Sequence, residues 1–147
     1  MSSLSRTARF FIILVCAAGL LALGAAWALA PRPASPWPIL VAVALSVLAA
    51  PFTVPLPVFG NVSIAFTFVF ATLLMLGTPP AAVAAAASGL AASLLRRGKR
   101  PPLYRLVFNS CALALTAVAA GTAYRLAGAL PGSILIARDL PAIFLAT

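Results

Sequence analysis

The sequence has almost no acidic residues and no histidine: Asp139 is the only aspartate or glutamate among 147 residues. Metal centres and carboxylate catalysis both need several His, Cys, Asp or Glu side chains. Only Cys16 and Cys111 add to this set, and both fall in apolar runs, where cysteine usually behaves as a small hydrophobic residue. The serines and threonines have no base beside them to activate a hydroxyl. These absences predict a protein that is not an enzyme and holds no metal or cofactor.

Charge of either sign is also scarce, with 7% charged and 64% hydrophobic residues, whereas a soluble domain carries about 25% charged residues. The mean hydropathy is +1.16. This composition predicts a single integral membrane domain over residues 1–147. The net charge of +9 comes from residues at the ends of apolar segments, which is typical of membrane anchors and not of a nucleic-acid-binding face. The bilayer, and no nucleic acid, is therefore the expected partner.

The apolar segments predict the fold class, which is all-α: a polytopic transmembrane helix bundle with five spans plus the start of a sixth. The spans are expected at about residues 10–30, 37–50, 63–76, 80–95 and 103–126, with the partial sixth at 140–147. A helix over residues 10–30 rises about 30 Å, enough to cross a bilayer core. A cleaved signal peptide is the alternative there, although Pro31 would disfavour cleavage. The apolar, uncapped end predicts that the chain is a fragment.

Two segments depart from ordinary spans. Residues 51–63 contain three prolines and a glycine, which exclude a regular helix although the segment is uncharged. Exposed extended backbone is not tolerated in hydrocarbon, so we expect an interfacial linker, with a re-entrant lid over a pocket as the alternative. Residues 80–95 consist largely of alanine, serine and glycine, and small side chains let neighbouring backbones approach closely. This helix is therefore expected at the centre of the bundle.

Five of the ten basic residues fall in residues 96–105. The positive-inside rule places this cluster in the cytoplasm, together with the N-terminus, which carries Arg6 and Arg9. The four predicted spans between these two points agree with that placement. The chain is thus expected to be a multi-pass protein of the inner (plasma) membrane. The residues expected to anchor it to anionic headgroups are Arg96, Arg97, Lys99 and Arg100.

One polar stripe interrupts the fifth predicted span. Arg105, Asn109 and Thr116 lie within about 40° of each other around a helix. Intramembrane polar residues are costly unless they pair or line a wet cavity. Either Asn109 and Thr116 bond to neighbouring helices while Arg105 reaches lipid phosphate, or the three residues line a ligand pocket. The sequence leaves both interpretations open.

The order of segments over about residues 61–128 resembles a known arrangement. It comprises a serine-initiated aromatic and aliphatic span, a Gly-Pro break, an alanine-rich span, an arginine loop and the pair Phe108-Asn109. It resembles the N-terminal multi-span membrane sensor regions of bacterial signalling proteins whose outputs are HD-GYP phosphohydrolase or GGDEF diguanylate cyclase domains. The resemblance implies a sensor or anchor module that relays a signal to a cytosolic output domain after the last span. No output domain is present in these 147 residues, so no cyclic-dinucleotide activity is assigned.

Two other functions fit the same features. The layout is also similar to the six-span substrate-binding components of vitamin and metal importers, which implies a small-molecule-binding subunit of a transporter. A structural membrane protein without a ligand is the third possibility. A homo-oligomer is compatible with each of them.

Overall fold

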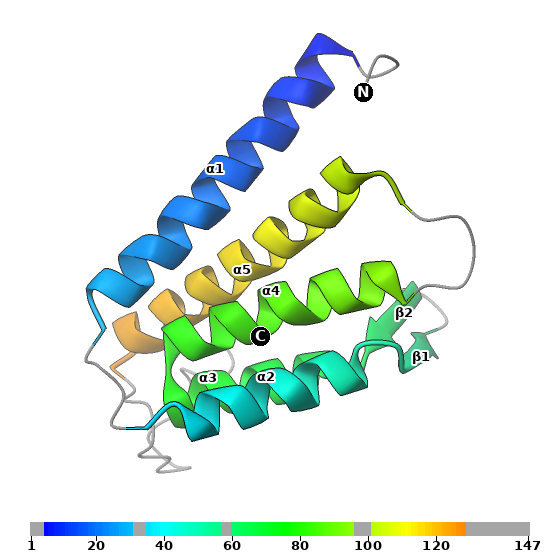
Figure 1. Ribbon diagram of the computed structural model, residues 1–147. Helices are drawn as coiled ribbons and strands as arrows, with labels where there is room; N and C mark the ends of the chain where they lie inside the picture. The colour runs from blue at the N-terminus through cyan, green and yellow to red at the C-terminus, as the bar shows by residue number, and fades with distance from the viewer. Residues whose placement is uncertain (1–4, 31–34, 57–59, 96–100, 129–147) are drawn as a thin grey trace.

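The computed structural model describes residues 5–30, 35–56, 60–95 and 101–128. Within these residues the chain forms five helices and one antiparallel hairpin (Figure 1). The elements are α1 (Arg6–Ala28), α2 (Trp37–Ala49), β1 (Thr53–Leu56), β2 (Gly60–Ser63), α3 (Ala65–Leu76), α4 (Thr78–Leu94) and α5 (Leu103–Leu126). The predicted all-α class is confirmed. The predicted partial span at 140–147 lies outside the described residues.

Only two of the described helices are long and apolar enough to cross a membrane, α1 with 23 residues and α5 with 24. At about 1.5 Å per residue each rises about 35 Å. The helices α2, α3 and α4 have 13, 12 and 17 residues. The described helices therefore include two of the length and hydropathy of a full span, and not the five that were expected. The physical reason is the interruption of the apolar segments, by the proline-rich hairpin after α2 and by Gly77 between α3 and α4. The φ of 90° at Gly77 lies in the left-handed region that favours glycine and ends α3 abruptly.

The five helices run alternately between the two ends of the bundle (Figure 1). The beginnings of α1 and α5, the end of α4 and the hairpin lie at one end. As a result α1 and α5 lie side by side and run in the same direction. The start of α1 and the start of α5 therefore lie at the same end of the bundle.

The alanine-rich helix α4 lies at the centre, as predicted, since it contacts each of the other four helices. Ala81, Ala82 and Ala84 are completely buried, whereas Leu90 and Leu94 are exposed. The small side chains let α5 approach closely: a Cβ at Gly89 would lie 3.5 Å from the Cα of Ser110. The α4–α5 interface is the most extensive in the bundle.

The strands β1 and β2 pair as an antiparallel hairpin, in which Thr53 is opposite Ser63. The Ser63 hydroxyl donates a hydrogen bond to the Ala50 carbonyl at 3.1 Å and accepts one from the Ala65 amide at 3.2 Å. The hairpin is thereby tied to the end of α2 and the start of α3. No described residue of the hairpin lines the crevice described below, and the choice between a linker and a lid stays a prediction.

Candidate functional site: an apolar crevice between three helices

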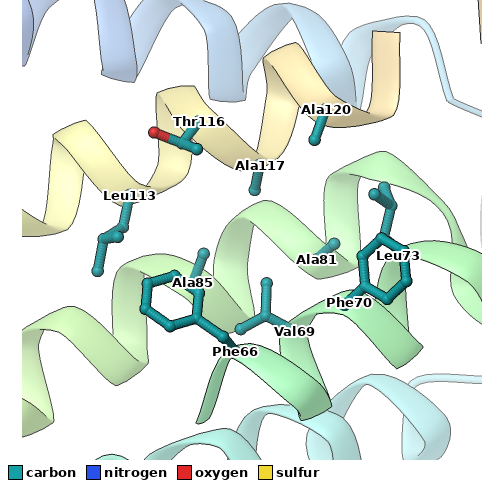
Figure 2. A pocket seen from close by; sticks show the side chains of 10 residues that line it. All are labelled: Phe66, Val69, Phe70, Leu73, Ala81, Ala85, Leu113, Thr116, Ala117 and Ala120. Carbon is teal, nitrogen blue, oxygen red and sulfur yellow. The ribbon is translucent and has the colours of Figure 1, made fainter. Parts of the chain in front are cut away.

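A cavity of about 320 Å³ lies between α3, α4 and α5 (Figure 2). Its lining consists of Phe66, Val69, Phe70, Leu73, Ala81, Ala85, Leu113, Thr116, Ala117 and Ala120. Nine of these ten side chains are hydrocarbon, and Thr116 contributes the one hydroxyl.

The crevice follows from the small residues of α4. Ala81 and Ala85 are one turn apart and form a recessed floor between α3 and α5. The two walls touch each other at only a few points because α4 holds them apart. On α3 the rings of Phe66 and Phe70, also one turn apart, form the larger wall. The space therefore arises because the small alanine side chains of α4 face the phenylalanine rings of α3, while α3 and α5 make few contacts with each other.

Thr116 supplies the only polar side-chain atom among the lining residues. Its hydroxyl donates a hydrogen bond to the Ala112 carbonyl of its own helix at 2.9 Å, and the hydroxyl oxygen keeps lone pairs that can accept a bond from a ligand. A site with one hydroxyl and no acid, base or metal ligand among its lining residues binds by shape and dispersion. It suits a small apolar molecule or a hydrocarbon chain.

The structure separates the three residues of the predicted polar stripe. Thr116 lines the crevice, whereas Asn109 and Arg105 do not. The Asn109 side-chain amide donates a hydrogen bond to the Ser93 hydroxyl at 3.3 Å and so links α5 to α4. Arg105 is exposed in the first turn of α5. Asn109 is thus a packing contact, and along the axis Arg105 lies about 16 Å from Thr116.

The walls and floor of the crevice were missed by reasoning from the sequence. The signal that could have found them is the spacing of Phe66 and Phe70 on α3, four residues apart on one helical face, beside an alanine-rich neighbour. A second hollow of about 440 Å³ lies between α2 and α3 and is also mostly apolar. Trp37, Phe68 and Met75 are among its lining residues. It has no link to the polar stripe of α5.

The predicted anchoring residues Arg96, Arg97, Lys99 and Arg100 lie outside the described residues. Arg6 and Arg105 are exposed, and each lies in the first turn of a helix that begins at the same end of the bundle (Figure 1). The described residues contain no acidic side chain, so they form no side-chain ion pair. The positive charge at this end is therefore available to an external anion.

Comparisons with protein-family models, with curated proteins and with solved structures find no match to this chain. The resemblance of residues 61–128 to membrane sensor regions stays a prediction.

Replacing Asn109 with leucine is expected to leave membrane insertion intact and to cost about 0.6 kcal/mol, the average for an interhelical hydrogen bond in a membrane protein. The variant Ser93→Ala removes the same bond from the other side and is expected to cost a similar amount, and the double variant no more than either. Thr122→Val is the control, because the Thr122 hydroxyl bonds only to the Val118 carbonyl of its own helix. Unfolding in a mixed-micelle SDS titration measures all four. Full additivity of the two losses would contradict the bond.

Proposed function

We propose that this chain is a membrane-embedded sensor or anchor module of a bacterial signalling protein, with the crevice as its input site. The crevice between α3, α4 and α5 is the observation that carries the proposal, because it offers an apolar ligand a site within the bundle. The proposed output is a cytosolic domain linked beyond the last span. The resemblance of residues 61–128 favours this role over that of a purely structural protein.

The exposed apolar surface of α1 supports a membrane location. Phe10, Leu20 and Leu21 are 69%, 62% and 74% exposed, and only 6% of the most apolar stretch of α1 is buried inside the bundle. A water-soluble protein rarely exposes apolar surface on this scale. Hydrocarbon solvates the same surface without cost.

We propose that the chain crosses the inner membrane five times, with its N-terminus in the cytoplasm. The short helices α2 and α3 would cross with a locally thinned bilayer, at a cost of fractions of a kcal/mol per Å of mismatch. The hairpin, whose outer edges carry unpaired backbone groups, belongs at the headgroup level. The exposed cations Arg6 and Arg105 at the same end favour the cytoplasmic side for that end.

The helix α5 is the element that could carry a signal. It forms one wall of the crevice and packs against both α4 and α1. A ligand shifts the arrangement only if it binds one arrangement of α3 and α5 more tightly than another. Because α3 and α5 touch at few points, their spacing is the degree of freedom that a bound ligand would change.

The test measures the binding of an apolar probe in the crevice and compares it with a variant in which a larger side chain occupies the crevice. The probe is palmitate carrying a diazirine group, photolysed with the purified protein in nanodiscs. Labelling of α3 and α5 at the lining residues is expected, and Ala120→Phe should reduce it about fivefold because the ring occupies the space. Ala119→Phe is the matched control, since Ala119 is exposed and does not line the crevice. Equal labelling of the two variants would contradict an input site here.

The transporter subunit is the competing function, and the same binding result would fit it. Co-purification separates the two: a binding subunit of an importer should copurify with an ATPase and a coupling subunit. A sensor module should not.

The proposed orientation has its own measurement. In a background with Cys16→Ser and Cys111→Ser, a membrane-impermeant maleimide should label Lys99→Cys in inside-out vesicles and not in spheroplasts. Gly128→Cys, at the far end of α5, should show the reverse, because one crossing separates the two positions. Labelling of Lys99→Cys from the periplasmic side would overturn the orientation.

A further inference from the structure

Cys16 and Cys111 come from different apolar segments, yet they lie side by side in the structure. Gly19, which follows Cys16 by one turn on α1, lies against Cys111 of α5, so the two cysteine side chains are near enough to interact across the α1–α5 interface. Both cysteines are free; Cys111 is buried and Cys16 is half-buried. From the sequence alone, each cysteine was interpreted as a small hydrophobic residue in its own apolar segment. The helix packing instead makes them a pair.

Two contacts on either side of Cys16 fix this pairing. Gly19, one turn further along the same face of α1, lies so close to Cys111 that an added Cβ would be 3.0 Å from the Cys111 Cβ and 2.6 Å from its carbonyl oxygen. Before Cys16, the ring of Phe11 lies 6.0 Å from that of Phe108. Because α1 and α5 run in the same direction (Figure 1), Cys16 lies between these two contacts along the interface, one turn before the residue that meets Cys111.

We infer that Cys16 and Cys111 form a two-electron dithiol site whose oxidant is a lipid-soluble quinone. Two S–H bonds break and one S–S bond forms between the sulfurs. The two electrons and the two protons pass to the quinone oxygens, which gives the quinol.

The chemistry of the surroundings selects this class of oxidant. The described residues contain no histidine or carboxylate that could take a proton from a thiol. A quinone accepts two protons together with two electrons, so its reduction to the quinol needs no separate base at the site. The oxidant must also dissolve in hydrocarbon, because Cys16 lies near the middle of α1. This last point rests on the proposed membrane location, whereas the pairing of the thiols does not.

The disulfide would change how α1 is held. Most of the surface of α1 faces away from the bundle, and its main contact is α5. Leu23 is one of the few α1 side chains that reach the buried cluster around α4. A covalent link at Cys16 would convert this limited contact into a fixed one, so the redox state would set the attachment of α1.

The experiment counts thiols in the purified protein in dodecyl maltoside, after reduction, removal of the reductant and exposure to decylubiquinone. The free thiols should fall from two to none per chain, with a mass loss of two hydrogens and no covalent dimer. Diamide, a thiol oxidant that is not a quinone, is used in a parallel experiment. Cys16→Ser and Cys111→Ser should each keep one thiol and form no bond within the chain.

A register-shifted variant, Cys16→Ser with Ala17→Cys, is the matched control. It moves the thiol about 100° around α1, and oxidation should be at least about tenfold slower because the sulfurs no longer face each other. Equal rates in this variant and in the native protein would overturn the pairing. Two thiols remaining with both oxidants would overturn the site, and oxidation by diamide alone would overturn the quinone. These outcomes do not depend on the labelling of the crevice.

Discussion

Replacing Gly121 with leucine is expected to separate α4 from α5 and to lower the free energy of unfolding by about 3 kcal/mol, the upper part of the range for overpacking a core. A Cβ at Gly121 would lie 2.7 Å from Cγ2 and 2.9 Å from Cβ of Thr78. Because the Cβ of Thr78 is itself too close, no rotamer of that side chain relieves the contact. The backbone of α4 must move at its first turn, beside the reversal at Gly77. Loss of helicity by circular dichroism in an SDS titration measures the effect.

Gly24→Leu is the control for this prediction. Gly24 lies in α1, and an added Cβ there meets no atom within 4 Å. The substitution also removes a helical glycine, so it should be neutral or stabilising by up to about 1 kcal/mol. Equal losses in Gly121→Leu and Gly24→Leu would mean that the close approach of α4 to α5 contributes little. Thr78→Gly should partly restore Gly121→Ala, since it removes the Cβ that causes the contact.

The central position of α4 could be predicted from the sequence because it depends only on side-chain size. A helix with Ala81, Ala82, Ala84 and Ala85 presents small side chains over most of its surface, so neighbouring helices can pack closely around it. The bounds of α5, Leu103–Leu126, also follow from local signals, since Pro101 and Pro102 precede it and Gly128, with φ of 82°, follows it. Local chemistry determines both features.

The lengths of α2 and α3 needed more than apolar composition. The predicted segments, residues 37–50 and 63–76, were already shorter than a full span of about 20 residues. The helices are shorter still, Trp37–Ala49 and Ala65–Leu76, because the hairpin includes Ser63 and Gly77 reverses the chain directly after Leu76. Hydropathy alone does not register a reversal of this kind, because glycine and proline lower it only slightly.

The crevice and the thiol pair depend on which helix faces meet, and periodicity within one helix does not determine that. Thr116 was predicted as a site residue from the stripe on α5, but Phe66 and Ala85 lie on other helices and became partners only through packing. In the same way, the spacing of Cys16 and Cys111 in the sequence gives no sign that α1 and α5 lie in parallel. Relations between distant segments require the tertiary structure.

Tyr124 is another residue whose position depends on helix packing and could not be predicted from its neighbours in the sequence. Next to Arg125 near the end of a span, it has the sequence pattern of an aromatic residue at the membrane–water interface. In the structure Arg125 is exposed, whereas Tyr124 is 1% exposed and belongs to the buried face of α5 with Ala117 and Gly121. The periodicity of four and three residues along that face outweighs the dipeptide, and the ring fills the bundle near the end of α5.

Tyr124→Ala is accordingly expected to lower the free energy of unfolding by about 3 kcal/mol, the low end of the range for truncating a buried aromatic residue. The low end applies because lipid solvates an exposed ring nearly as well as the bundle does, so the loss is mainly that of packing around the cavity left behind. Leu126→Ala is the matched control in the same turn, since Leu126 is 84% exposed and its truncation should cost little. The SDS titration that measures Gly121→Leu also measures this pair. Similar losses for Tyr124→Ala and Leu126→Ala would return Tyr124 to the membrane interface, where its ring would contact headgroups and leave α4 and α5 packed as before.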